Sequence, residues 1–522
     1  MEMEKQIGDA PLILERLWKW MSQKLREFAV PILTAFLFGF LAHGFAFTNK
    51  LVNHDEVFTL FFKGGSVSLG RWGLDFIDRV FPDYSMPWIY GIVTIPLMAA
   101  AVCVMVHVFS IRSKLLQALL AGIILVFPSL TGAFSYMFMS CTYSLSFLLA
   151  VIAASLVRQG KVKEWIIAII CMVGSLSLYQ AHIAIAASLL VLVLIQRLLH
   201  ETDVMPLIKK GIQYVLFLIL SMGIYYIAVK VMQYWKNVGF NSYAAGNLSF
   251  DLRTIPSDIA DAYATFFQYI TQGYQGLIPT AFSRGVHMLC FCVAAILLLA
   301  WALNQKGKRL ARFGMLFALI GILPLSSNCL HLFATRDSVH TLVACGFVSI
   351  YVLVVILAQD CPPALPEGKL RTMARSIALN LITLCLAVVI IVNTYIANES
   401  YLNLYLRYEN ACSFYTSLIA DLKLMPEFNE DTKLAVIGTF QEPSFYLEKF
   451  SFSDDITGID GFLPDSYSKD KFMEYYMGFP IEFATEQEIQ EITATAEYAG
   501  MAVYPYYGSM QWFDNILVVK LS

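Results

Sequence analysis

Two adjacent carboxylates, Asp55 and Glu56, come directly after the first long apolar segment of the chain. A carboxylate at the edge of a membrane can take a proton from an attacking hydroxyl or hold a divalent cation such as Mg²⁺ or Mn²⁺. The run Gly70-Arg71-Trp72-Gly73 adds a guanidinium, whose planar fork matches phosphate oxygens. An acidic pair alone favours an ordinary solvated loop with Arg71 and Trp72 in an interfacial belt. The Gly-Arg-Trp-Gly run shifts the balance toward a functional site.

A second polar cluster, Ser177-Leu178-Tyr179-Gln180-Ala181-His182, separates two short apolar runs. Polar groups at membrane depth are costly unless they are paired or line a cavity. We therefore consider Tyr179, Gln180 and His182, together with Trp72 of the first loop, as candidates for substrate binding. Hydrogen bonding between helices explains the same residues equally well.

A third cluster runs from Ser326 to His340 and includes His331, Arg336 and Asp337. Arg336 is the basic residue of this turn, so an anionic group such as a phosphate is a candidate partner. The alternatives are a local pair with Asp337 or an arginine that snorkels to the membrane surface. The histidines follow no recognised spacing of metal ligands.

The composition indicates a membrane protein. The chain has 522 residues, of which 58% are hydrophobic and 14% charged, whereas soluble domains carry about 25% charged residues. The net charge of -3 argues against nucleic acid as a partner, because phosphate binding needs a basic face. The ten cysteines lie mostly in apolar runs, which is typical of small buried side chains rather than of a disulfide framework.

Apolar segments long enough to cross a bilayer predict about eleven transmembrane helices. We expect them near residues 29–48, 88–108, 115–132, 143–157, 165–179, 182–198, 211–233, 284–303, 313–328, 338–358 and 377–397.

The basic residues predict the orientation. Segments rich in Lys and Arg, including 158–163, 306–312 and 369–375, all fall on the side of the N-terminus, whereas the turns near 133–141 and 180 carry none. The positive-inside rule then places the N-terminus in the cytoplasm. Residues 1–28 are expected to form an amphipathic helix on that surface, in contact with membrane lipids. An odd number of spans places the C-terminus outside.

Three parts are thereby predicted to lie on the outer face of the membrane. They are the loops 49–87 and 234–283 of the membrane domain 29–397, and the tail 398–522. Acidic and polar residues return in the tail. Its segment 401–424 has a helical pattern, and the β-rich runs 433–438 and 516–521 predict strands. The fold class expected is therefore a polytopic α-helical membrane protein with a small C-terminal extracytoplasmic α/β domain.

The order of these motifs resembles that of a known family. The acidic first loop with Gly70-Arg71-Trp72, the motif Tyr179-Gln180-Ala181, and the tail from Tyr408-Glu409-Asn410 to Val436-Ile437-Gly438 resemble the type II, serotype-converting O-antigen glucosyltransferases. That family belongs to the GT-C superfamily of multispan glycosyltransferases.

The resemblance implies transfer of a glucosyl group from polyprenyl-phosphate-glucose to a cell-envelope glycan, on the outer face of the bacterial inner membrane. It implies that Asp55 is the general base with Glu56 beside it, and that Arg71 faces the donor phosphate. Relatives often have two Asp where this sequence has Asp-Glu. A role for Arg336 toward the phosphate follows from its position alone.

A flippase or transporter of a lipid-linked sugar is the rival hypothesis, because it also needs many spans and polar groups within them. The two halves of the sequence show no repeat, and the spans carry almost no acidic residues for ion coupling. A membrane anchor for the tail is a third possibility, but it needs no carboxylate pair.

Overall fold

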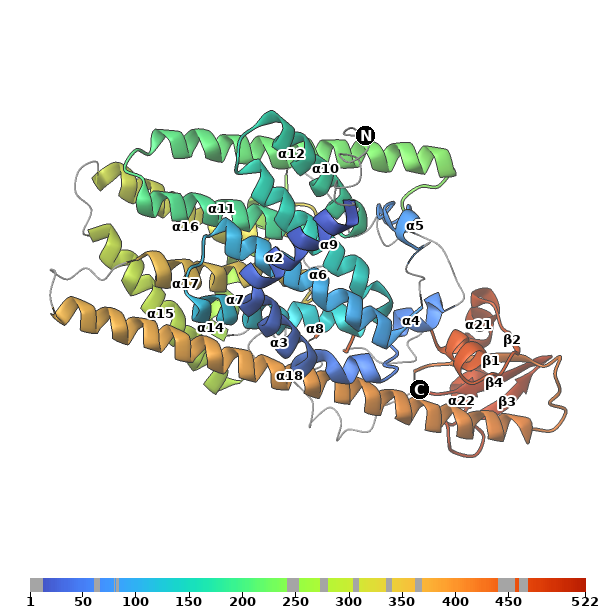
Figure 1. Ribbon diagram of the computed structural model, residues 1–522. Helices are drawn as coiled ribbons and strands as arrows, with labels where there is room; N and C mark the ends of the chain where they lie inside the picture. Colours follow the sequence, from blue (N-terminus) through green and yellow to red (C-terminus); the bar gives the residue numbers. More distant parts are fainter. Residues whose placement is uncertain are drawn as a thin grey trace, which may run out of the picture.

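The computed structural model describes residues 13–60, 66–78, 80, 84–241, 253–272, 280–303, 309–334, 340–361, 369–439, 456–459 and 468–522. These residues form a bundle of helices with a small β-sheet at one end (Figure 1). We call that end the sheet end. The short helices α4 (His54–Thr59) and α5 (Leu74–Ile77) also lie there (Figure 1).

The other helices before the sheet differ widely in length. They are α2 (Ile13–Glu27), α3 (Ala29–Thr48), α6 (Pro87–Val108), α7 (Lys114–Leu125), α8 (Pro128–Ser135), α9 (Met137–Val157), α10 (Val162–Leu178), η1 (Gln180–His182), α11 (Ile183–His200), α12 (Met205–Lys236), α14 (Ile255–Gln272), α15 (Ala281–Leu303), α16 (Arg309–Ser327), η2 (Cys329–Leu332), η4 (Ala344–Val348), α17 (Ser349–Asp360) and α18 (Lys369–Lys423).

The described residues contain eight helices that are long and apolar enough to cross a membrane, or nine if a bent pair counts as one span. The protein is therefore a polytopic helical membrane protein. Each of the eleven predicted segments overlaps a helix, but α10, with 17 residues, and α17, with 12, are short for a full span. The number eleven stays a prediction. Helix α2 precedes the first span and has no buried residue, as the predicted surface helix requires.

Several spans are broken. The segment predicted at 115–132 is the bent pair α7 and α8, whose axes differ by 42°. Pro128 begins α8, where its missing N–H is tolerated because the first N–H groups of a helix have no partner within it. Helix α9 begins at Met137, six residues before the predicted start at 143. The one-turn helix η1 interrupts the path from α10 to α11.

The predicted outer loop 234–283 is wrong in one respect, because the 18-residue helix α14 lies within it. Its residues Phe266 and Tyr269 are buried, and the hydroxyl of Tyr263 donates to the carbonyl of Gly321 on α16 at 2.5 Å. Only one face of α14 is apolar, and this face packs on the bundle. The mean hydropathy of the α14 segment is therefore too low to signal a membrane span.

The predicted boundary at 398 falls inside α18, which continues without a break from the bundle to the sheet (Figure 1). The strands expected at 433–438 and 516–521 are β1 (Lys433–Ile437) and β4 (Ile516–Lys520). With β2 (Glu482–Phe483) and β3 (Met510–Phe513) they form one sheet in the order β2-β1-β4-β3. Strand β1 is parallel to both neighbours, and β3 is antiparallel to β4. The short helices of this region are α20 (Lys469–Lys471), the π-helix η5 (Phe472–Tyr476), α21 (Glu486–Thr493) and α22 (Ala496–Gly500).

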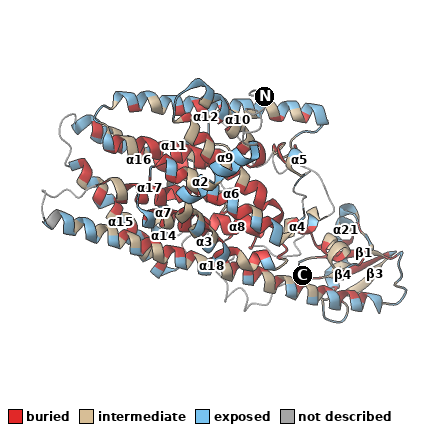
Figure 2. Ribbon diagram, in the orientation of Figure 1, coloured by how far each residue is buried: buried red, intermediate tan, exposed pale blue. Residues whose placement is uncertain are grey.

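The first predicted loop packs into the core beneath the sheet. Val52 and Val57 are fully buried and share one apolar cluster with Tyr415 of α18, Leu434 of β1 and Phe472 of η5. Buried residues run through the centre of the bundle and continue to this cluster (Figure 2). The start of the chain therefore helps to attach the sheet to the helices.

The contact between α3 and α6 depends on a glycine. A Cβ atom at Gly91 would lie 2.4 Å from a ring atom of Phe47, which is closer than atoms can approach. We expect Gly91→Ala to lower the midpoint of thermal unfolding of the purified protein, because overpacking a dense core costs about 1–3 kcal/mol. Gly44→Ala is the matched control, since no atom lies within 4 Å of its Cβ position. Equal midpoints for the two variants would contradict this packing.

Candidate functional site

Helix α4 carries the two predicted carboxylates, and Asn53 holds it in place. The side-chain oxygen of Asn53 accepts from the backbone N–H of Glu56 at 2.9 Å, which caps the helix. Its amide nitrogen donates to the carbonyl of Ser135, at the end of α8, at 2.7 Å. Acidic residues in a first turn are also stabilised by the helix dipole. The Asp-Glu pair thus has a structural role in addition to any chemical one.

The two carboxylates lie in different environments. Glu56 has no exposed surface and forms an ion pair with Lys50. It also lies near Tyr476 of η5. Burial, and then the negative charge of Glu56, raise the pKa of the Tyr476 phenol well above its ordinary value. The side chain of Asp55 is 47% exposed, and one of its oxygens lies 3.8 Å from Nε2 of His54. Only Asp55 is accessible to a molecule arriving from water.

The turn that carries Arg71 docks onto the start of η1. The amide of Gln180 donates to the carbonyl of Leu69 at 3.0 Å and to the hydroxyl of Tyr225 at 2.9 Å. That hydroxyl in turn donates to the carbonyl of Gly70 at 3.0 Å. Gly70 has a φ of +76°, and a Cβ there would lie 2.8 Å from the Tyr225 hydroxyl. The turn therefore requires glycine at this position, and the amide nitrogen of Gln180 holds the turn. The role of Gln180 toward a substrate stays a prediction.

Arg71 lies against the ring of Tyr179, with its guanidinium carbon 5.1 Å from the ring centre. The charge of Arg71 also acts on the imidazole of His340. Trp72 points elsewhere and packs edge-on against Phe76 at 6.2 Å. Arg71 thus brings a positive charge close to Tyr179 and His340, whereas Trp72 packs locally.

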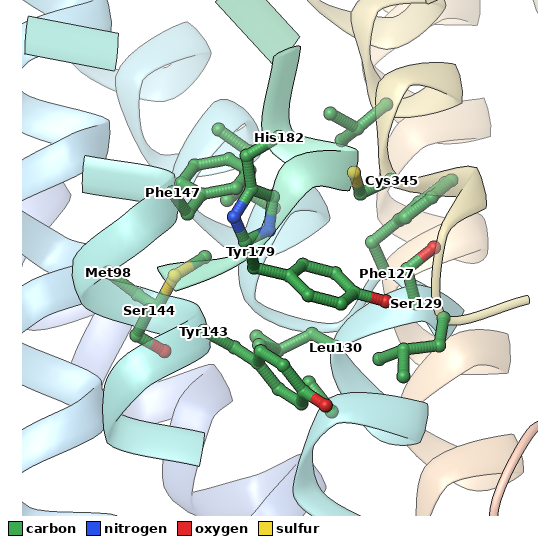
Figure 3. Close-up of a pocket in the computed structure, with 14 residues that line it drawn as sticks. Met98, Phe127, Ser129, Leu130, Tyr143, Ser144, Phe147, Tyr179, His182 and Cys345 are labelled. Carbon is green, nitrogen blue, oxygen red and sulfur yellow. The ribbon is translucent and has the colours of Figure 1, made fainter. Parts of the chain in front are cut away.

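A cavity lies beside Tyr179, among α7, α8, α9, η1 and the turn before η4 (Figure 3). The rings of Tyr143 and Tyr179 are 4.5 Å apart in its wall. His182 lines it too, with Nδ1 2.7 Å from the hydroxyl oxygen of Ser146. The rest of the lining is mainly apolar: Met98, Ile124, Phe127, Ser129, Leu130, Ala133, Ser144, Phe147, Leu342, Cys345 and Val348.

Two hydroxyls of the lining have no protein partner. The side-chain oxygens of Ser129 and Ser144 are buried and accept or donate no hydrogen bond within the described residues. An unmet buried polar group costs about 1–3 kcal/mol, so native structures rarely keep one without a reason. Both hydroxyls are therefore available to a bound molecule with polar groups.

The third predicted cluster divides into two parts. Asn328 donates to the hydroxyl of Thr265 at 2.5 Å, and Ser327 bonds with Ser349 at 2.9 Å, so these residues join helices to one another. His340 instead lies near Arg71. Arg336 and Asp337 lie outside the described residues, and the role predicted for Arg336 stays a prediction.

A family model described as "Glucosyl transferase GtrII" matches residues 44–353, which is more than half of the chain. The chain belongs to the GtrII glucosyl transferase family. The matched region contains α4, the Arg71 turn, η1 and every residue named in the cavity lining. No curated protein and no solved structure matches significantly.

In this glucosyltransferase single residues of all three polar clusters come together, because Arg71 lies against Tyr179 and its charge acts on His340. The structure brings Arg71, Tyr179 and His182 together around the cavity, and Asn53 ties the helix of Asp55 to α8, which lines it. Sequence reasoning missed Ser129, Tyr143 and Ser144. The rule that polar groups within apolar helices deserve scrutiny would have marked all three.

A divalent cation between the two carboxylates was a further prediction, and these residues do not fit one well. Glu56 is already paired with Lys50. Within the described ranges no group of three His, Cys, Asp or Glu side chains lies close enough to hold a metal ion.

The docking of the Arg71 turn can be tested at Gln180. Gln180→Leu removes the donor to Leu69 and Tyr225 and leaves a carbonyl unmet, so we expect glucosyl transfer to fall about tenfold. Gln213→Leu on the exposed face of α12 makes the same chemical change and should leave transfer unchanged. A Gln180→Leu enzyme as active as the Gln213→Leu enzyme would show that the turn does not need this bond.

Proposed function

We propose that this glucosyltransferase moves a glucosyl group from polyprenyl-phosphate-glucose to a cell-envelope glycan at the outer face of the bacterial cytoplasmic membrane. The observation that carries the proposal is the contrast at α4, where an exposed Asp55 and a buried, paired Glu56 are neighbours on a helix that Asn53 ties to α8, which lines the apolar cavity. Only one of the two carboxylates is in a position to meet an acceptor.

A lipid-linked donor suits this site. The cavity walls are largely apolar and lie within a bundle of membrane helices. The sequence contains neither a P-loop nor a glycine-rich dinucleotide motif to bind a nucleotide sugar. Arg71 supplies a positive charge against the ring of Tyr179, which lines the cavity, and an arginine fork binds phosphate oxygens in pairs.

The sugar ring of the donor would lie against Tyr143 and Tyr179. Rings of this kind present apolar faces to a pyranose, and the unmet hydroxyls of Ser129 and Ser144 would bond its hydroxyl groups. Hydrogen bonds to groups that are otherwise buried and unmet discriminate strongly between ligands with and without the matching hydroxyl.

The reaction would be a single displacement. Asp55 takes the proton of the acceptor hydroxyl while the oxygen attacks the anomeric carbon of glucose. The bond from that carbon to the phosphate oxygen breaks, and polyprenyl phosphate leaves with both electrons. Arg71 stabilises the charge that develops on the phosphate. One displacement inverts the configuration at the anomeric carbon.

The orientation proposed follows from the basic residues. Arg158, Lys161 and Lys369 all lie next to helix termini remote from the sheet: the end of α9, the start of α10 and the start of α18. The positive-inside rule assigns that end to the cytoplasm. The sheet end, with Asp55 and the cavity, would then face the outside, where the acceptor glycan is found.

The decisive experiment compares Asp55→Asn with Glu56→Gln. Labelled glucose on synthetic polyprenyl phosphate is offered to the purified enzyme with envelope glycan as acceptor. We expect Asp55→Asn to lose about 10²–10⁴-fold in kcat, the usual worth of a general base. We expect Glu56→Gln to retain most of the turnover but to unfold at a lower temperature, because Lys50 loses its partner. Full activity in Asp55→Asn would exclude it as the base, and no transfer by the wild type from several polyprenyl donors would overturn the proposed donor.

Arg71→Lys tests the phosphate contact. Lysine keeps the charge but not the fork, nor the flat contact with Tyr179. We expect kcat/KM for the lipid-linked donor to fall by about tenfold or more, a loss of ~1.4 kcal/mol or more in transition-state binding. The KM for the acceptor should not change. An equal loss for donor and acceptor would point to general disorder of the turn.

A further inference from the structure

Residues 456–459 follow the last candidate span in the sequence by more than thirty positions, yet they lie among the helices of the bundle. Ile456 and Ile459 have no exposed surface and belong to the same apolar core as α3, α6 and α9. A short piece of the C-terminal region is therefore part of the membrane bundle at its sheet end.

Thr457 makes hydrogen bonds with three separate parts of the site. Its hydroxyl oxygen is 2.9 Å from Nδ1 of His340 and accepts from the backbone N–H of Leu342 at 3.3 Å. Its carbonyl accepts from the hydroxyl of Ser135 at 3.0 Å. Leu342 lines the cavity, and the carbonyl of Ser135 holds Asn53, which caps the helix of Asp55.

The neighbours of Thr457 fix its position. Buried Arg407 of α18 donates to the carbonyl of Ile459 at 3.0 Å and is itself held by Asn403 at 3.0 Å. Gly458 has a φ of +86°, and a Cβ there would lie 2.0 Å from the Ser135 hydroxyl oxygen. The segment thus approaches α8 so closely that only glycine fits at position 458.

We infer that Thr457 is a positioning residue of the transferase, which holds the cavity wall through Leu342 and His340 and the helix of Asp55 through Ser135 and Asn53. The C-terminal region then takes part in glucosyl transfer itself, in addition to any contact it makes with the acceptor. This inference rests on the proposed roles of Asp55 and of the cavity.

The physical argument is one of geometry. A general base contributes fully only when it is held within a fraction of an ångström of its working position. Asp55 is half exposed at the start of α4, and the capping bond of Asn53 fixes the helix turn that carries it. The restraint on Asn53 leads through Ser135 to Thr457. The bonds of the Thr457 hydroxyl with His340 and Leu342 hold the residue so that its carbonyl stays seated against the Ser135 hydroxyl. Loss of the Thr457 hydroxyl should let this seating relax and so impair the chemical step more than the binding of substrate.

The test uses the full-length enzyme with Thr457→Val, which keeps the shape and removes the hydroxyl. We expect kcat to fall about tenfold while both KM values stay within about twofold of the wild type. Thr457→Ser restores the hydroxyl and should restore kcat. Thr416→Val, on the exposed face of α18, is the matched control and should behave as the wild type. Wild-type kcat in Thr457→Val, or a change confined to KM, would overturn the inference.

A second measurement tests the seating of the segment without relying on activity. Thr457→Cys and the exposed Ser417→Cys are treated with a water-soluble maleimide in detergent solution, and labelling is followed at each peptide by mass spectrometry. Thr457 is 8% exposed, so we expect its cysteine to react at least about tenfold more slowly than that at Ser417, since labelling requires access to the thiolate. Equal rates would overturn the inference. If the wild type transfers no glucose but residue 457 is protected, the proposed donor fails while the seating stands.

Discussion

The sheet end of the protein depends on how Ser135 satisfies its hydrogen bonds where α8 ends. In a dry environment an unmet backbone group costs several kcal/mol, so a helix that stops inside a membrane bundle needs partners from elsewhere. The carbonyl of Ser135 finds Asn53 and its hydroxyl finds the carbonyl of Thr457. These partners come from opposite ends of the chain. The break after α8 thereby fixes the first loop and the C-terminal segment against the same helix.

Breaks of this kind cluster around the cavity. The bend between α7 and α8, the short helix η1 and the 3₁₀ turn η4 all contribute to its wall. Irregular backbone is tolerated within a membrane only where protein buries it or where it lines a cavity. The same breaks free backbone and side-chain polar groups to point inward instead of along a helix. A bundle of unbroken apolar helices would leave no polar surface at this depth, so the broken helices are a condition for a site here.

The sequence predicted the helices well and the contacts between distant residues poorly. Each apolar segment marks its helix because about 20 apolar residues in a row have one stable arrangement in lipid. Helix α14 escaped notice because only one of its faces is apolar. The sequence also could not distinguish Asp55 from Glu56. Neighbouring residues on a helix point about 100° apart, so their surroundings depend on what packs against each face.

The hydrogen bond between Thr457 and Ser135 could not be predicted from the sequence. Ser135 and Thr457 are 322 residues apart, and neither belongs to a pattern that signals a partner. Gln180 shows the opposite case. Its position between two short apolar runs marked it as a group with a polar partner, and one partner in the fold is the backbone of Leu69. A polar residue in an apolar context predicts that a bond exists, and only the fold decides with what.

Helix α4 lies between the bundle and the sheet and is shared by both. On one side His54 packs edge-on against Tyr136, which joins α8 to α9. On the other, Val57 is buried with Tyr415 and Phe472 in the core beneath the sheet. With six residues, α4 is too short to be stable by itself and takes its structure from these two surfaces. Any shift of the sheet against the bundle must therefore move α4 and Asp55 with it. A glycan held on the sheet side would thus be coupled mechanically to the proposed base, through a helix that both partners support.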